Sequence, residues 1–255
     1  MNLYPKEWLP QLKYDCFRFS FLATIRSIRR GAYPLADISK RQDRTTMELL
    51  GNINIILYLT AYLTGGIPFG YLLARKFAGI DIKEYGSGNI GATNVLRVLK
   101  SKDPILAKKL GAATLLLDAI KGVVVILAGM LLGAPDTTLW SIGVLSVIGH
   151  CFSPYLNFEG GKGVATGFGV LAILLPIPSL IALVSWVVVA KGLKISSLSS
   201  LIATAILLVS SYIIYPDGLT GIGSHSPLWV IVTIIFYKHI PNIVRLIEGE
   251  EKRVA

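Results

Sequence analysis

Residues 163–190 read "GVATGFGVLAILLPIPSLIALVSWVVVA", an apolar stretch that decides how often the chain crosses a membrane. A single helix over the whole stretch would be about 42 Å long at a rise of about 1.5 Å per residue. The hydrocarbon core of a bilayer is only about 30 Å thick. Pro176 and Pro178 would also interrupt such a helix. We therefore predict two helices here, 163–176 and 177–191, although the first is short.

Five further apolar runs are long enough to span a bilayer. They cover 53–74, 112–133, 138–156, 198–215 and 227–240. The composition agrees with a polytopic membrane protein, since 53% of the 255 residues are hydrophobic, only 16% are charged and the mean hydropathy is +0.62. The sequence therefore predicts an all-α integral membrane protein with seven transmembrane helices.

The distribution of Lys and Arg supports the seven-span prediction. Seven spans place 75–111, 157–162, 191–197 and 238–255 on one side of the membrane, and the opposite loops, "GAPDT", "PIP" and "YPDGLTGIGSHSP", contain no Lys or Arg. Merging 163–190 into one span would divide the basic residues between the two sides. The positive-inside rule makes the basic side cytoplasmic. The basic residues on that side are Arg75, Lys76, Lys83, Arg97, Lys100, Lys102, Lys108, Lys109, Lys162, Lys191, Lys194, Lys238, Arg245, Lys252 and Arg253.

Residues 1–46 form a separate basic extension before the membrane domain, 47–255. The extension carries half of the formal net charge of +10, so the charge is not a nucleic-acid signal spread over the chain. It contains no apolar run that could span a bilayer. Three interpretations stay open: a disordered basic arm, an amphipathic surface helix over 17–28, or translated sequence upstream of a true start at Met47. The last would also explain why its basic residues fall on the wrong side.

The first candidate site is "EYGSGNIGATNVLR", residues 84–97. Its glycines match the letters of a dinucleotide-binding turn, but no strand precedes them and no acidic residue follows at the required offset. Glycines instead allow consecutive backbone N–H groups to converge on an anion. The alternative is an ordinary interfacial turn. The residues predicted to bind a phosphate or carboxylate are Gly86, Ser87, Gly88, Asn89, Gly91, Thr93, Asn94 and Arg97.

The second candidate site is "FEGGKGVATGFG", residues 158–169. It is not a Walker A loop, because Leu156 stands where the first Gly belongs and Gly163 follows Lys162. It still offers a Lys on a glycine loop at the start of a helix, where an anion is favoured. The alternative is a snorkelling interfacial Lys with glycines for close helix packing. The predicted ligands are Gly160, Gly161, Lys162, Gly163 and Thr166.

Two further segments on the cytoplasmic side carry polar groups. Residues 194–200, "KISSLSS", include Ser197, although serines at a helix entry commonly act as caps. Residues 237–251, "YKHIPNIVRLIEGEE", place His239, Asn242 and Arg245 at intervals of three, and Pro241 favours a helix that begins there. Taken alone, this run is typical of a solvated C-terminal helix. The four weak anion-binding signals nevertheless share one membrane face, which favours a common site.

Inside the predicted spans, Asp118 and Lys121 are three residues apart and can pair, which lowers the cost of burying either. We interpret His150 as a hydrogen-bonded packing residue. No histidine is followed five positions later by Asp, so the HxxxxD arrangement of the large glycerolipid acyltransferases is absent from the sequence. A transporter of an anionic solute is the competing class, but it would need more polar residues near the midplane. A non-catalytic membrane scaffold is the third functional class considered.

Six segments together resemble the bacterial acyl phosphate-dependent glycerol-3-phosphate acyltransferases, the PlsY family. They are "IPFGYLLAR", "GSGNIGATNVLR", "LDAIKG", "GHCFSPYLNFEGGKGVAT", "SSLSS" and "KHIPNIVRLIEGEE". The resemblance runs from about Ile53 to Glu251. Two features depart from the family: the N-terminal extension, and Lys194 where members often carry Arg.

The resemblance implies an inner-membrane enzyme with seven spans, its N-terminus outside and its active site at the cytoplasmic face. It would transfer an acyl group from acyl phosphate to the sn-1 hydroxyl of glycerol 3-phosphate. Such a donor is already activated, so no metal, cofactor or cysteine nucleophile is expected. The expected partners are the two substrates and the bilayer, with no nucleic acid, and the expected chain is a monomer. The implied roles are Ser87 and Arg97 as essential groups, Gly160–Gly163 as the glycerol phosphate site, His239 and Asn242 as activity-supporting groups, and Glu251 as a structural acid.

Overall fold

The structure, a computed structural model, describes residues 52–253, and all its regular elements in that range are helices. The predicted basic extension and Met47 lie outside the described residues. Residues from Ile53 onward form one compact unit. Its helices are α3 (Ile53–Gly66), α4 (Phe69–Ala78), α5 (Ala92–Lys100), α6 (Pro104–Leu131), α7 (Asp136–Cys151), α8 (Val164–Leu174), α9 (Pro176–Leu193), α10 (Ser196–Ile214), α11 (Ser226–Lys238) and α12 (Ile240–Ile247), with 3-10 turns η1 (Ile82–Glu84) and η2 (Pro154–Leu156).

Each of the seven predicted spans corresponds to a helix or a pair of helices in the described range. Five segments are long and apolar enough to cross a bilayer: Ile53–Ala78, Pro104–Leu131, Asp136–Leu156, Pro176–Leu193 and Ser196–Ile214. A sixth is added if α11 and α12, bent by 55°, count as one span. The helix at the remaining predicted span, α8, has 11 residues and extends about 16 Å. The all-helical membrane fold is confirmed, while the count of seven spans stays a prediction.

The apolar stretch 163–190 is divided into two helices, as its prolines predict. Leu175 leaves the helical conformation with φ −137° and ψ 66°, and α9 begins at Pro176. A proline is tolerated in the first turn of a helix because its missing N–H would be unpaired there in any case. The division makes α8 a short helix that begins beside the loop 157–163.

Two boundaries differ from the sequence expectation. The first predicted span, 53–74, is broken between α3 and α4 at Ile67–Pro68, because Pro68 has no backbone N–H to continue the helical hydrogen bonds. The second, predicted at 112–133, begins eight residues earlier at Pro104, because Asp103 accepts hydrogen bonds from the backbone N–H groups of Ile105 and Leu106. Hydropathy missed this first part because Lys108 and Lys109 lie in it.

Glycines allow α3 and α7 to pack backbone to backbone. A Cβ atom on Gly149 would meet the Tyr62 carbonyl, and one on Gly65 would meet the Ser146 carbonyl. Small residues at helix interfaces are typical of membrane bundles, where lipid supplies no hydrophobic drive and close van der Waals contact is the main attraction. The contact fixes the end of α7, from which the loop 152–163 leaves.

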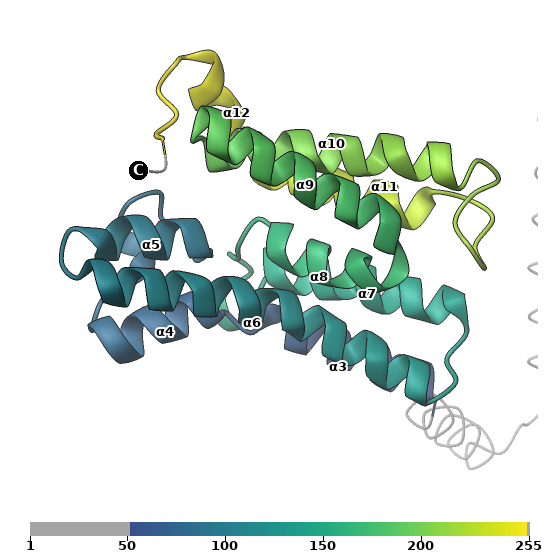
Figure 1. Ribbon diagram of the computed structural model, residues 1–255. Helices are drawn as coiled ribbons and strands as arrows, with labels where there is room; N and C mark the ends of the chain where they lie inside the picture. The colour runs from purple at the N-terminus through teal and green to yellow at the C-terminus, as the bar shows by residue number, and fades with distance from the viewer. Residues whose placement is uncertain (1–51, 254–255) are drawn as a thin grey trace, which may run out of the picture. The chain divides into compact units, whose positions relative to one another are not determined.

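The two ends of the helical unit differ in charge. Figure 1 shows α5, α12 and the α9–α10 turn at one end, and the α6–α7 and α10–α11 connections at the other. The first end carries Lys100, Lys102, Lys194 and Arg253, whereas the α6–α7 and α10–α11 connections contain no Lys or Arg. Between the ends, large apolar side chains such as Leu116, Val188 and Ile213 are exposed, as expected for surfaces that face lipid.

Candidate active site

A cavity of about 500 Å³ opens among α5, α6, α8, α9, α10, α11 and α12. One part of its wall is polar and comes from the loops and helix ends predicted to bind anions. The other part is apolar and comes from the helices. The polar lining includes Ser87, Asn89, Thr93, Arg97, Lys162, Ser197, His239, Asn242 and Glu251, and the apolar lining includes Leu115, Phe168, Leu171, Trp186, Leu207 and Val232.

The side chain of Asn94, which is only 2% exposed, organises the first loop. Its amide nitrogen donates to the carbonyls of Ile82, Tyr85 and Asn89, and its oxygen accepts from the backbone N–H of Ser87 at 2.9 Å. Gly86 has φ +66°, and a Cβ there would collide with the Asn94 amide. The loop therefore folds around Asn94.

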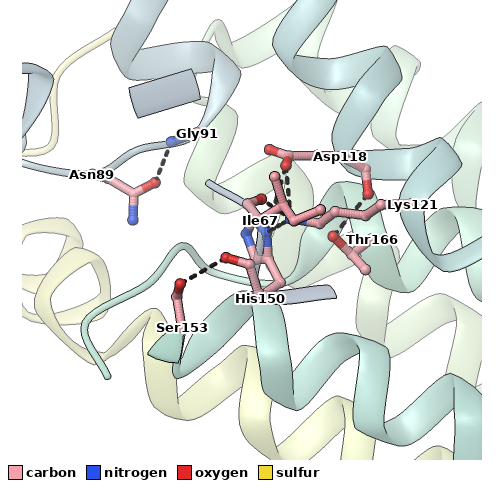
Figure 2. Close-up of polar contacts among 9 residues, drawn as sticks. Ile67, Asn89, Gly91, Asp118, Lys121, His150, Ser153 and Thr166 are labelled. Carbon is pink, nitrogen blue, oxygen red and sulfur yellow. Dashed lines mark hydrogen bonds and ion pairs between the residues drawn. The ribbon is translucent and has the colours of Figure 1, made fainter. Parts of the chain in front are cut away.

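This arrangement leaves two polar groups of the first loop free for a ligand. Arg97 lines the cavity from α5, and neither its guanidinium nor the Ser87 hydroxyl makes a hydrogen bond within residues 52–253. Asn89 lines the cavity too, but its oxygen accepts from the Gly91 N–H at 2.9 Å (Figure 2). The Thr93 hydroxyl lies 3.1 Å from that of Ser196, which links α5 to the start of α10.

The second loop brings Lys162 into the same cavity. Its ammonium group donates to the side-chain oxygen of Asn242, so two of its three N–H groups remain for a ligand. Gly161 lies against the ring of His150, where a Cβ would overlap the imidazole. The loop is thus pressed onto the end of α7. At the surface, Lys83 pairs with Glu159 at 3.0 Å and ties the two loops together.

Glu251 links α10 to α12 at the cavity wall. Its side chain, 8% exposed, accepts hydrogen bonds from Ser197 at 2.7 Å, from the amide nitrogen of Asn242 at 2.6 Å and from Arg245 at 2.7 Å. Because Asn242 donates to Glu251 with its nitrogen and accepts from Lys162 with its oxygen, its amide orientation is fixed. The network therefore holds Lys162 in place from the C-terminal segment.

Burial makes the ammonium group of Lys162 more acidic than that of an exposed lysine. Burial lowers the pKa of Lys162 to about 8; the Glu251 charge opposes this shift, and the charges of Arg245 and Arg97 add to it. Burial alone would raise the pKa of Glu251, but the hydrogen bonds from Ser197, Arg245 and Asn242 lower it overall. Glu251 is consequently ionised at neutral pH, while Lys162 is charged there and loses its proton in the mildly alkaline range.

His239 lies between α11 and α12 and is 2% exposed. Its Nδ1 lies 2.8 Å from the Ile235 carbonyl oxygen, which can only accept, so Nδ1 carries the proton. In the neutral ring, Nε2 is then a hydrogen-bond acceptor. Since His239 lines the cavity, the site contains one imidazole that is able to receive a proton.

A buried ionic cluster of Asp118, Lys121 and His150 contacts the second loop through the His150 ring, and Figure 2 shows its side chains. Lys121 pairs with Asp118 at 2.9 Å, as their spacing predicts, and also contacts His150 Nδ1 and the Ile67 carbonyl. The Thr166 hydroxyl donates to the Asp118 carbonyl at 2.8 Å, which joins α8 to α6. Asp118 and His150 both line the cavity. In residues 52–253, no three His, Cys, Asp or Glu side chains are grouped in a way that could hold a metal ion.

The sequence profile of the family described as "Glycerol-3-phosphate acyltransferase" matches residues 55–249. The chain belongs to this glycerol-3-phosphate acyltransferase family. A relative of that name from a Nitratiruptor species is 58% identical over 209 residues, which cover 82% of this chain and 100% of the relative. A relative of the same name from Helicobacter pylori is 44% identical over 217 residues, 82% of this chain and 99% of the relative.

Comparison with solved structures supports the same family. The chain is similar to PlsY (YgiH), an integral membrane glycerol 3-phosphate acyltransferase, in its glycerol 3-phosphate form, with a TM-score of 0.70 and 32% identity over 80% of this chain and 96% of that chain. The lysophosphatidic acid form of PlsY gives 0.69 and 33% over 79% and 95%. The resemblance to the PlsY family is thereby confirmed, and the chain is a multi-pass membrane protein of the acyltransferase family.

The cavity of this family member gathers most, but not all, of the residues predicted from sequence. It is lined by Ser87, Asn89, Gly91, Thr93, Asn94, Arg97, Lys162, Gly163, Ser197, His239 and Asn242. The predicted residues that are not part of this lining are Gly86, Gly88, Gly160, Gly161, Thr166 and Arg245. Asn94, Thr166 and Arg245 use their side chains in hydrogen bonds within the protein.

Asp118, His150 and Trp186 are among the lining residues that the sequence did not place at the site. Asp118 was interpreted as an ion-pair partner of Lys121 and His150 as a packing residue, and Trp186, on α9, carried no motif. The available signal for the first two was their position: ionisable residues within membrane helices are costly and mark functional sites by default. Trp186 could only be found by the fold that brings α9 beside the cavity.

Proposed function

We propose that the protein transfers a fatty acyl group from acyl phosphate to the sn-1 hydroxyl of glycerol 3-phosphate. The products are 1-acyl-glycerol 3-phosphate and phosphate, and the step begins phospholipid synthesis. The observation that carries the proposal is one cavity with a polar wall that bears Arg97 and Lys162 and an apolar wall of helix side chains. Both substrates present a phosphate, and only the donor also presents an alkyl chain.

The polar wall suits two phosphates. Two anions repel each other, so a site that brings them together must supply positive charge. Arg97 reaches the cavity from α5 and Lys162 from the loop before α8. We assign Lys162 and the glycine loop to glycerol 3-phosphate, and Ser87 and Arg97 to the donor phosphate. His239, Asn242 and Ser197 complete the polar wall.

The reaction needs no covalent enzyme intermediate. The glycerol hydroxyl attacks the acyl carbon, a new ester C–O bond forms, and the bond from the acyl carbon to the phosphate oxygen breaks. The departing phosphate keeps its electron pair and is stabilised by the same donors that bound it. The hydroxyl proton goes either to His239 Nε2 or to a substrate phosphate oxygen, and His239→Ala separates these routes by its effect on the pH–rate profile.

The location follows from the distribution of charge. The basic end of the helical unit carries the polar loops, and we assign it to the cytoplasmic face of the inner membrane, where glycerol 3-phosphate would arrive from water. The donor's alkyl chain would lie along the apolar wall at the depth of the lipid. A phosphate-handling enzyme gains from being in the membrane because both its donor and its product are lipids.

The deciding experiment supplies purified protein with labelled glycerol 3-phosphate and one of three donors: acyl phosphate, acyl-CoA or acyl carrier protein. We expect labelled lysophosphatidic acid only with acyl phosphate, together with one phosphate released per turnover. Product formation from acyl-CoA alone would contradict the proposed donor. Lys162→Ala should reduce kcat/KM for glycerol 3-phosphate by about 10²-fold or more, since it removes the cation assigned to that phosphate.

A further inference from the structure

Lys121 has three hydrogen-bond partners and three protons to give. Its ammonium nitrogen lies 2.9 Å from the Ile67 carbonyl, 2.9 Å from Asp118 Oδ1 and 2.8 Å from His150 Nδ1. Paired with the Asp118 carboxylate, it is the cation of a buried ion pair, and an ammonium group only donates. His150 Nδ1 must therefore accept.

The tautomer of His150 follows directly. When Nδ1 of a neutral imidazole accepts, the ring proton is on Nε2, so His150 offers an N–H donor there. This is the opposite of His239, whose Nδ1 donates to the Ile235 carbonyl. The two cavity histidines thus present opposite groups to a ligand: His150 an N–H, and His239 a lone pair.

His150 Nε2 lies against Gly161 at the edge of the cavity. The residue is 4% exposed and lines the cavity, and no hydrogen bond to Nε2 exists within residues 52–253. In that range, the fully enclosed side-chain nitrogen and oxygen atoms that lack a partner are those of Ser146 and Ser179, so His150 Nε2 is not enclosed. An unpaired donor in a buried site costs free energy unless a ligand accepts from it.

The position of His150 indicates which ligand atom that is. Its ring touches Gly161, one residue before Lys162, and on its other side lies Asp118, next to the apolar lining residue Ala119. This is the border between the polar and apolar walls. In an acyl phosphate the atom at that border is the acyl carbonyl, between the phosphate and the alkyl chain.

We propose that the His150 Nε2–H donates to the acyl carbonyl oxygen of the donor, with Lys121 and Asp118 as positioning residues that fix its tautomer; the proposal rests on the function proposed above. The carbonyl oxygen gains negative charge as the glycerol hydroxyl attacks and loses it as the phosphate leaves. A preorganised N–H at that oxygen lowers the barrier to the attack. The neutral donor suits an oxygen that is uncharged before the reaction, whereas Arg97 and Lys162 suit the phosphates.

The test compares two non-reactive inhibitors of equal chain length. In a β-ketophosphonate, a CH₂ group replaces the bridging oxygen of acyl phosphate and the carbonyl is kept; the matched alkyl phosphonate lacks the carbonyl. We expect the wild-type protein to bind the ketophosphonate about three- to ten-fold more tightly, as one neutral hydrogen bond would give. His150→Phe should abolish this ratio and leave the affinity for the alkyl phosphonate unchanged.

A matched control is His225→Phe, which removes a buried histidine outside the cavity lining and should keep the wild-type ratio. If His150→Phe weakens both inhibitors equally, the side chain does not contact the carbonyl and the proposal fails. The comparison uses binding alone, so it does not require acyl transfer to occur. Turnover of acyl phosphate by the wild-type protein tests the proposed function separately.

Nitrogen NMR of the wild-type protein, labelled at its three histidines, keeps the proposal testable if His150→Phe does not fold. We expect the His150 signals to show a proton on Nε2 and the His239 signals to show a proton on Nδ1, so each histidine is an internal reference for the other. A His150 ring without a proton on Nε2 would overturn the proposal. The signals are assigned by their loss in His225→Gln and His239→Gln, which leaves the third set to His150.

Discussion

At the scale of a single residue, Lys162 should make the capture of glycerol 3-phosphate depend on pH. Burial holds the pKa of its ammonium group at about 8 in the unliganded protein. As the pH rises through this value the cavity loses a positive charge, and its attraction for a phosphate falls. We expect kcat/KM for glycerol 3-phosphate to decrease above pH 8, by about ten-fold per pH unit, because kcat/KM reports ionisation of the free enzyme.

The control for this prediction is Lys162→Arg. An arginine stays protonated throughout the range, so the decrease above pH 8 should disappear even if the substitution lowers the rate. A decrease that persists unchanged in Lys162→Arg would assign the alkaline limb to another group.

Glu251 should tune Lys162 through its charge. Its carboxylate raises the pKa of Lys162, and its hydrogen bonds hold Asn242, to which Lys162 donates. We expect Glu251→Gln to move the alkaline limb of kcat/KM to lower pH and to raise KM for glycerol 3-phosphate several-fold. Glu250→Gln, at the exposed neighbouring position, should change neither quantity. An unmoved limb in Glu251→Gln would show that the carboxylate acts by position alone.

At the residue scale, the sequence predicted which side chains gather but not how each is used. Arg97, Lys162 and His239 line one cavity, as glycine loops and basic side chains on one membrane face indicate. Asn94 was predicted from the same pattern, yet its amide is saturated by four hydrogen bonds of the first loop. Side-chain amides suit ligands and loops equally, so only the fold reveals which partner each one has.

At the level of elements, the contact between α3 and α7 should be sensitive to a single methyl group. A Cβ on Gly149 would overlap the Tyr62 carbonyl, so Gly149→Ala must push the two helices apart. We expect it to destabilise the protein by about 1–3 kcal/mol, as overpacking commonly does. The midpoint of thermal unfolding in detergent measures this.

Gly192→Ala is the matched control, because it adds the same methyl group to α9 where no atom lies within 4 Å. Alanine favours a helix over glycine, so the midpoint should stay the same or rise slightly. Equal losses in both variants would mean that helix separation is not the cause.

The prolines at 176 and 178 predicted one element boundary, whereas the break at Pro68 and the extension of α6 beyond its apolar run were not predicted. Pro176 separated α8 from α9 in the sequence as in the structure. The start of α6 depends on capping by Asp103, and hydropathy alone cannot detect it behind Lys108 and Lys109. The length of α8 matters most, because a helix of 11 residues is too short to span a bilayer core alone.

At the scale of the whole molecule, the charge difference between the two ends should fix the orientation in the membrane. The described connection between α5 and α6 lies among basic residues, whereas the α10–α11 connection has none. Transfer of Lys and Arg across a bilayer is unfavourable, so we expect the α5–α6 turn in the cytoplasm and the α10–α11 turn outside. This is also the orientation that lets glycerol 3-phosphate reach Lys162 from the cytoplasm.

Single cysteines test this orientation. With Cys16 replaced by Ser and the buried Cys151 kept, Ser101→Cys and Thr220→Cys place an exposed thiol in each turn. In intact cells, a membrane-impermeant maleimide should label Thr220→Cys at once and Ser101→Cys only after lysis, while a permeant maleimide labels both throughout. The reverse labelling pattern would mean that the protein has the opposite orientation in the membrane. Labelling of both thiols in intact cells would mean that both connections lie outside. Either result would separate the cavity from its cytoplasmic substrate, because the loops that line it lie toward the same basic end as Ser101.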